Sequence, residues 1–212
     1  MELLETDWNQ PRPELDEVLS MCDRIELKVI QARSDAVTQV LQCLRESHCN
    51  GGATFATVAL GPDRVLDWFA SRNRWLEWEI LPRLLRREPI TSFLAELQIG
   101  SLQGSPGEGG TCSTSGTDGF CMDNAFLFDG QLAACLYFGG AYTRPVGDGR
   151  TAKQMALGFC EALFQQRFSE VSLFTSREAW TPWFHCIAWD WTAVLFDRRD
   201  RSLHILAVTD TD

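Results

Sequence analysis

The last thirty residues of the chain constrain its fold more than any other stretch. They contain two apolar, β-prone runs, Trp183 to Asp197 and Ser202 to Asp212, separated by the polar residues 198–201. This pattern is typical of a β-hairpin. Because both runs are strongly hydrophobic, we expect the hairpin to be buried on at least one face and to lie at the centre of the fold.

Hydrophobic periodicity predicts alternating strands and helices in the first half of the chain. Residues 24–32 alternate apolar with polar side chains, which indicates a strand, and 53–60 form a second β-type run. Apolar residues at helical spacing predict a helix over about 35–47, preceded by N-cap candidates, and another helix after Gly61-Pro62-Asp63. The pattern between Trp75 and Leu97 is ambiguous.

Within that ambiguous stretch, two kinds of structure are compatible with the residues. Residues 75–80 fit a strand with alternate side chains buried, whereas 83–87 and 91–97 fit helical segments around Pro82 and Pro89.

Hairpin signals are concentrated in the second half of the chain. The apolar runs 125–128 and 131–138 flank an Asp-Gly pair, which favours a type I′ turn. Apolar residues at helical spacing predict a helix over 151–163, and 170–174 is a further short strand. Because hairpins cluster here, we predict an α+β fold with a largely antiparallel sheet and helices packed on one face.

We interpret residues 1–212 as a single domain, since a chain of 212 residues is long enough to bury one large core. Residues 1–22 are expected to form an N-terminal arm with at most a short helical turn after Pro13. Residues 104–119 are almost all small or polar, so we expect a flexible Gly/Ser-rich loop. This loop lacks the lysine and the pattern of a phosphate-binding loop.

Charge and hydropathy exclude two classes of partner. A net charge of −10 disfavours binding to a nucleic-acid backbone, which requires clustered Lys and Arg. No stretch approaches the roughly 18 consecutive apolar residues of a membrane span. The N-terminus opens with acidic residues and has no basic region followed by an apolar core, so we expect neither a signal nor a transit peptide. The predicted location is the cytoplasm.

The cysteines and histidines do not have the spacing of a metal site. The chain has eight cysteines but no Cys-x-x-Cys, and it has three histidines, so we predict no metal and no cofactor. We expect free thiols, with a Cys112–Cys121 disulfide under oxidation as the alternative.

The C-terminal carboxylates are the strongest candidates for chemistry. Asp190 interrupts an aromatic run, and Asp210 and Asp212 end the sequence. If the strand is interior, Asp190 needs a hydrogen-bond donor, which Arg177, a tryptophan indole N–H or backbone amides could supply. The alternative is an acid/base dyad or a divalent-metal site formed by these three residues. His185 and Cys186 are neighbours and would point to opposite faces of a strand, so they cannot pair with each other.

The same region is rich in tryptophan, a residue that is enriched at binding hot spots. Four tryptophans fall within twelve residues. Core packing is the alternative explanation for them. The candidate interface consists of Trp180, Trp183, Trp189, Asp190, Trp191, Asp210 and Asp212.

Three segments of this region carry a resemblance to a known group of proteins. Residues 179–184 (AWTPWF), 187–190 (IAWD) and 207–212 (AVTDTD) resemble the C-terminal signature of small, acidic, uncharacterised bacterial proteins, some of them associated with polymorphic-toxin immunity. This resemblance implies a cytoplasmic protein that neutralises a toxin by tight binding, with its acidic surface matched to a basic cleft.

We therefore predict a non-enzymatic protein-binding module, an immunity protein of a bacterial toxin system, with a protein partner that has a basic surface. One alternative is a small hydrolase that uses Asp190 with His185, His204 or a cysteine. The other is a regulatory or structural subunit of a larger assembly, in which the glycine-rich loop becomes ordered on contact.

Overall fold

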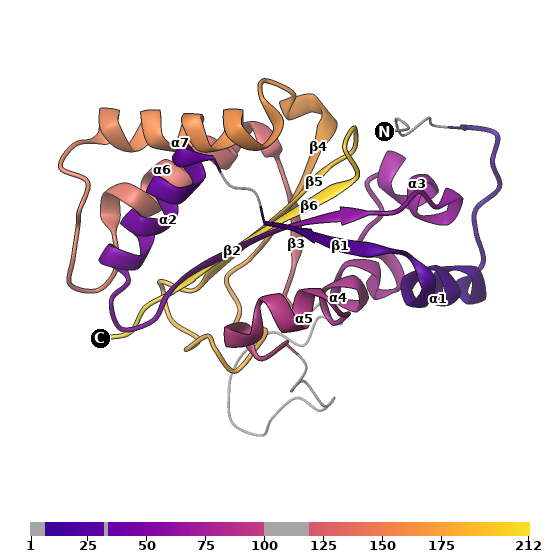
Figure 1. Cartoon of the computed structure of the whole chain (residues 1–212), viewed down its shortest axis with the longest axis horizontal. Helices are drawn as coiled ribbons and strands as arrows, with labels where there is room; N and C mark the ends of the chain where they lie inside the picture. The colour runs from indigo at the N-terminus through magenta and orange to yellow at the C-terminus, as the bar shows by residue number, and fades with distance from the viewer. Residues whose placement is uncertain (1–6, 32–33, 100–118) are drawn as a thin grey trace.

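One antiparallel sheet of six strands forms the middle of the molecule, and helices cover both of its faces (Figure 1). The computed structural model describes residues 7–31, 34–99 and 119–212. Neighbouring strands follow the order β1-β2-β6-β5-β4-β3, and every pairing is antiparallel. The strands are β1 (Leu27–Ile30), β2 (Gly52–Leu60), β3 (Cys121–Asp123), β4 (Val171–Ser176), β5 (Trp191–Asp197) and β6 (Ser202–Thr209).

The C-terminal hairpin occupies the interior of this sheet. Every residue of β5 and β6 is buried, and Val194 pairs with Ile205 across the hairpin. Because both faces are covered, apolar residues occupy successive positions instead of alternate ones. The predicted hairpin is confirmed from Trp191 to Thr209. Residues 183–190, which were expected to belong to its first strand, instead form turns, and Cys186 has φ +59°.

The helices form two layers, one on each face of the sheet. The first layer contains α2 (Asp35–Ser47), α6 (Phe128–Phe138) and α7 (Gly149–Phe164). The second contains α1 (Leu15–Arg24), α3 (Arg64–Ser71), α4 (Ile80–Leu85) and α5 (Ile90–Phe93). Short 3₁₀ turns are η1 (Glu77–Glu79), η2 (Ala95–Leu97), η4 (Ala125–Leu127) and η5 (Phe168–Glu170).

Each layer has a hydrophobic core of its own. In β5, Val194 belongs to the core beneath the α1 layer, whereas its neighbour Leu195 belongs to the core beneath the α2 layer. Successive side chains of a strand point to opposite faces, so one hairpin serves both cores. The predicted α+β class and antiparallel sheet are confirmed. The expectation that helices pack on one face is corrected, because the hairpin is apolar on both sides.

The helices predicted from periodicity begin at polar caps. The side chains of Ser34, Asp63 and Asp148 accept hydrogen bonds from backbone N–H groups in the first turns of α2, α3 and α7, respectively. These bonds satisfy donors that have no partner within the helix. All three helices are confirmed. The strands predicted over 53–60 and 170–174 correspond to β2 and β4. Of the strand predicted over 24–32, only Leu27–Ile30 forms β1, and Arg24 belongs to α1.

Two segments expected to be β-structure are helical. Residues 125–138 form η4 and α6, not a hairpin, and Phe128, Leu132 and Leu136 are buried at intervals of four residues. The Asp-Gly pair lies in the first turn of α6. The strand considered for 75–80 is also wrong, since this segment leads through η1 into α4.

The N-terminal arm is more structured than expected. Instead of a short turn after Pro13, the chain forms the ten-residue α1, in which Val18 and Met21 are fully buried. Of the flexible loop predicted over 104–119, only Gly119 lies within the described residues. The seven cysteines of the described segments are free thiols, and Cys112 lies outside them. None of the helices described is both long and apolar enough to cross a bilayer.

Candidate functional site

The carboxylate of Asp190 holds a loop to the sheet. Its Oδ2 accepts hydrogen bonds from the backbone N–H groups of His185 (3.0 Å) and Ile187 (3.2 Å). Its Oδ1 accepts a bond of 2.5 Å from the Thr209 hydroxyl. The residue is fully buried. Asp190 therefore has the hydrogen-bond donors expected for a buried carboxylate. Two of them are backbone amides and the third is the Thr209 hydroxyl.

Asp210, which directly follows β6, has a similar structural role. Its Oδ1 accepts from the Asn50 N–H (2.9 Å) and its Oδ2 accepts from the Ala141 N–H (2.7 Å). The side chain is fully buried and joins the chain end to two loops. The carboxylates of Asp190 and Asp210 thus bind backbone N–H groups in two different parts of the chain. Asp212 is exposed. Among the residues that the structure describes, no three His, Cys, Asp or Glu side chains are grouped to hold a metal.

Burial divides the tryptophans of the predicted interface into two pairs. Trp180 and Trp191 are buried, and the indole N–H of Trp180 donates to the Thr192 hydroxyl (2.8 Å). Trp183 and Trp189 are half-buried. Of the seven predicted interface residues, only these last two and Asp212 present side-chain surface to a partner. The others stabilise the loop and the sheet.

The residues of the hydrolase alternative are not brought together. His185 contacts the Asp190 carboxylate through its backbone N–H, and its side chain is exposed, as is that of Cys186. His204 pairs with Leu195 across the hairpin. Burial lowers the pKa of His204 to about 4, and its Nδ1 lies 3.0 Å from the Thr57 hydroxyl. This histidine is neutral and buried in the sheet.

A different surface, at the β3 edge of the sheet, exposes large apolar side chains. Met122, Phe126 and Leu127 are 56%, 62% and 56% exposed, respectively. We call these three residues the β3–η4 surface. Phe126 stacks on Phe168 of η5 with ring centroids 5.7 Å apart. Such a concentration of exposed Met and aromatic side chains is characteristic of interaction sites.

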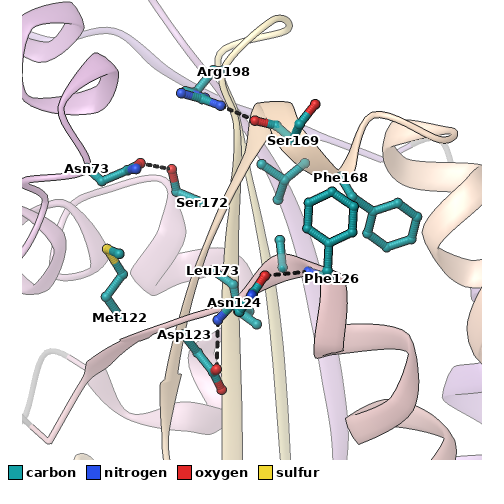
Figure 2. A pocket seen from close by; sticks show the side chains of 12 residues that line it. Asn73, Met122, Asp123, Asn124, Phe126, Phe168, Ser169, Ser172, Leu173 and Arg198 are labelled. Atoms are coloured by element: carbon teal, nitrogen blue, oxygen red, sulfur yellow. Dashed lines mark hydrogen bonds between the residues drawn. The ribbon is translucent and has the colours of Figure 1, made fainter.

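A groove of about 440 Å³ runs beside this surface (Figure 2). Met122 and Asp123 lie toward one end, and Arg198 and Ser169 lie at the other. The Ser172 hydroxyl donates to the Asn73 side chain (2.6 Å), and both residues line the groove. The groove thus combines an apolar side with a rim of hydrogen-bonding groups.

The turn that carries Phe126 is fixed by local polar bonds. The Asn124 side chain accepts from the Phe126 N–H (3.0 Å), and the Asn124 N–H donates to Asp123 (2.7 Å). Asp123 also accepts from Gln131 Nε2 (2.7 Å), which joins β3 to α6. These bonds fix the backbone of the turn from which the exposed ring of Phe126 projects.

Comparison with known protein families, curated proteins and solved structures finds no match to this chain. Fold and side-chain geometry are therefore what bear on its function.

Sequence reasoning missed the β3–η4 surface because it interpreted 125–138 as a buried hairpin. One signal was available. Phe128, Leu132 and Leu136 define the inner face of a helix, and Phe126 and Leu127 precede that face and are exposed. A helical interpretation of the segment would have identified these two apolar residues as lying outside the core.

Proposed function

We propose that this protein is a non-enzymatic protein-binding module and that the β3–η4 surface is its main contact with the partner. The observation that carries the proposal is the exposure of Met122, Phe126 and Leu127, each more than half accessible, beside the groove of Figure 2. Burying such side chains in a partner contributes about 25 cal/mol per Å² of apolar area.

The sheet edge offers a second kind of contact. Strand β3 pairs with β4 on one side, and in the described segments no strand pairs with its other side. An edge strand presents backbone donors and acceptors to which a partner can add a strand. With only three residues, β3 would contribute a few main-chain hydrogen bonds beside the apolar contact.

The class of partner follows from charge and from the resemblance of the C-terminal segments. A net charge of −10 favours a partner with a basic surface, because opposite charges increase the association rate of the two proteins. We propose that the partner is a bacterial toxin and that this chain is its immunity protein, acting in the cytoplasm. The segments 179–184, 187–190 and 207–212 support this class of protein.

The hydrolase alternative has less support from the geometry. A general base needs a carboxylate or imidazole within reach of the proton that it removes. The Asp190 carboxylate is already bound by two amides and the Thr209 hydroxyl, and the residue is fully buried. Its hydrogen bonds hold the loop of residues 185–190 in place.

The test is an affinity capture from the native host with the protein tagged at its N-terminus, followed by binding measurements on the purified partner. Phe126→Asp should weaken the complex by at least about 100-fold, because it places a charge in an apolar contact. Co-expression of the wild-type chain, but not of Phe126→Asp, should protect cells from the partner.

The matched control is Tyr142→Ser, which removes an aromatic side chain that is 67% exposed in the loop after α6. Phe126 and this loop lie at opposite ends of α6, a helix of 11 residues and so about 16 Å long. Equal binding by the two variants would overturn the assignment of the surface. A partner without toxicity would overturn the immunity function, and self-association through Phe126 would replace the toxin with a second copy of this chain.

A further inference from the structure

A second cavity, of about 450 Å³, lies against α6 on the side of the C-terminal loop. We call it the α6 cavity. Its walls include Gln131, Cys135 and Phe138 of α6, together with Arg144, Arg177 and Trp189. This size falls within the range of pockets that hold small molecules.

Two arginines at this cavity have no acidic partner in the part of the chain that the structure describes. Within the described segments, no carboxylate lies at ion-pair distance from Arg144 or Arg177, although the chain carries ten more acidic than basic residues. Burial raises the pKa of Cys135 to about 12, and the charge of Arg177 acts on the same thiol in the opposite direction. The thiol therefore stays neutral, and both arginines are exposed, so an anionic ligand in the cavity can reach them.

Gln131 adds a hydrogen-bond acceptor without a donor. Its Nε2 donates to the Asp123 carboxylate (2.7 Å), and because a carboxylate only accepts, this bond fixes the orientation of the amide. The Oε1 atom at the other side of the amide is buried and has no hydrogen-bond partner among the described residues, so a donor reaches it once the atoms that cover it shift. A buried acceptor of this kind is costly unless a donor reaches it.

Aromatic side chains supply the apolar part of the cavity. Phe138 is 60% exposed although it lies at the end of a helix with a buried face, and Trp189 is half-buried. The loop that carries Trp189 is held by the Asp190 carboxylate, through the bonds from His185 and Ile187. The indole is thus placed by the polar network that surrounds Asp190.

We propose that the α6 cavity binds a small aromatic carboxylate that also carries an N–H or O–H donor. The carboxylate meets Arg177 and Arg144, the donor meets Gln131 Oε1, and the ring packs against Phe138 and Trp189. This site does not depend on the protein-binding function proposed above.

Isothermal titration of the full chain with indole-3-acetate tests the site, because this probe has a carboxylate, an aromatic ring and one N–H donor. Two analogues remove one feature each. Indole-3-acetamide lacks the charge and should bind at least about tenfold more weakly. 1-Methylindole-3-acetate lacks the donor and should bind about five- to tenfold more weakly.

Arg177→Gln should weaken the binding of indole-3-acetate by at least about tenfold, whereas Arg150→Gln should not change it. Arg150 is exposed in the first turn of α7 and does not line the cavity, so it controls for the general loss of positive charge. Unfolding temperatures of both variants verify that the fold is intact.

The proposal is overturned if indole-3-acetate does not bind at millimolar concentration, if the amide binds equally well, or if Arg177→Gln binds like the wild type. A peptide ending in Gly-Gly-Trp provides a further arm, since it presents an indole and a carboxylate at a chain end. Tighter binding of this peptide than of indole-3-acetate would assign the cavity to a protein C-terminus and overturn the small-molecule ligand.

Discussion

The hydroxyl of Thr209, the last residue of β6, donates a hydrogen bond of 2.5 Å to Oδ1 of the buried Asp190. Asp190 directly precedes β5 and Thr209 ends β6, so the bond joins the two ends of the C-terminal hairpin, nineteen positions apart in the chain. This bond attaches the turns of residues 181–190, including the half-buried Trp189, to strand β6 of the sheet. The same carboxylate that sequence reasoning considered for catalysis is thus a structural link.

Replacing this carboxylate should destabilise the protein. Asp190→Ala leaves two backbone N–H groups and the Thr209 hydroxyl without an acceptor, which should lower the free energy of unfolding by about 3 kcal/mol. Urea denaturation followed by tryptophan fluorescence measures the change. Asp212→Ala is the control, because this side chain is exposed, and it should alter stability by less than about 0.5 kcal/mol. Equal stability of the two variants would show that the Asp190 bonds are dispensable.

Gly140 should not tolerate a side chain. A Cβ at this position would lie 2.2 Å from Asp210 Oδ2 and 2.4 Å from the backbone oxygen of Ser47. Gly140→Ala must displace the carboxylate that binds Asn50 and Ala141, so it should cost at least about 2 kcal/mol of stability.

Gly147→Ala is the matched control for this substitution. A Cβ at Gly147 would meet no atom within 4 Å. The change should therefore leave stability within about 0.5 kcal/mol or raise it slightly, because alanine restricts the unfolded chain. Thermal unfolding of both variants decides the matter, and a Gly140→Ala protein as stable as wild type would contradict the close packing.

Sequence reasoning succeeded where a local rule determines the structure. The helix predicted over about 35–47 is confirmed, because its apolar positions and its cap at Ser34 indicate the same element. The C-terminal hairpin was recognised from its hydrophobicity. The uninterrupted apolar runs of β5 and β6 also indicated burial on both faces, which would have predicted the second helical layer.

Sequence reasoning failed where short apolar runs are compatible with both a helix and a strand. The Asp-Gly pair at 129–130 favours a hairpin turn locally, but packing of Phe128 and Leu132 against the sheet selects a helix. The β3–η4 surface and the α6 cavity both depend on that helix. The need of Asp190 for hydrogen-bond donors was predicted, and two of them are backbone amides, as considered. The role of Asp210 could not be predicted, since its donors at Asn50 and Ala141 come from segments far along the chain.

The ion pair between Arg167 and Asp197 should be more important for stability than those on the surface. Two guanidinium nitrogens donate to the two carboxylate oxygens of Asp197, at 2.8 and 2.7 Å, and the Asp197 side chain is fully buried. Arg167→Met leaves a buried carboxylate without its cation and should cost about 3 kcal/mol.

Arg64→Met is the control for an exposed pair. Arg64 contacts Glu17 at 3.3 Å, and its side chain is 79% exposed. Its removal should change the free energy of unfolding by less than about 0.5 kcal/mol. Denaturant titrations of the two variants under the same conditions give the comparison. Similar losses would mean that burial of Asp197 adds nothing to the strength of its pair.

The buried His204 should make the protein less stable in acid. Burial lowers the pKa of this imidazole to about 4, from an ordinary value of about 6.5. Between these two pH values the unfolded chain binds a proton that the folded chain does not, so the free energy of unfolding falls as the pH decreases through this window. From pH 7.5 to 4.5 the share of His204 is about 2 to 3 kcal/mol. Below pH 4 this share changes no further.

Urea titrations across this pH range measure the effect, and a variant isolates the residue responsible. His204→Leu removes the titrating group, so its stability should depend less on pH by that amount, whatever its stability at pH 7.5. The remaining dependence includes His48, whose pKa is also lowered, chiefly by burial. If His204→Leu and the wild type lose the same stability between pH 7.5 and 4.5, then His204 binds a proton equally well in the folded and the unfolded chain. That result would contradict the lowered pKa of His204.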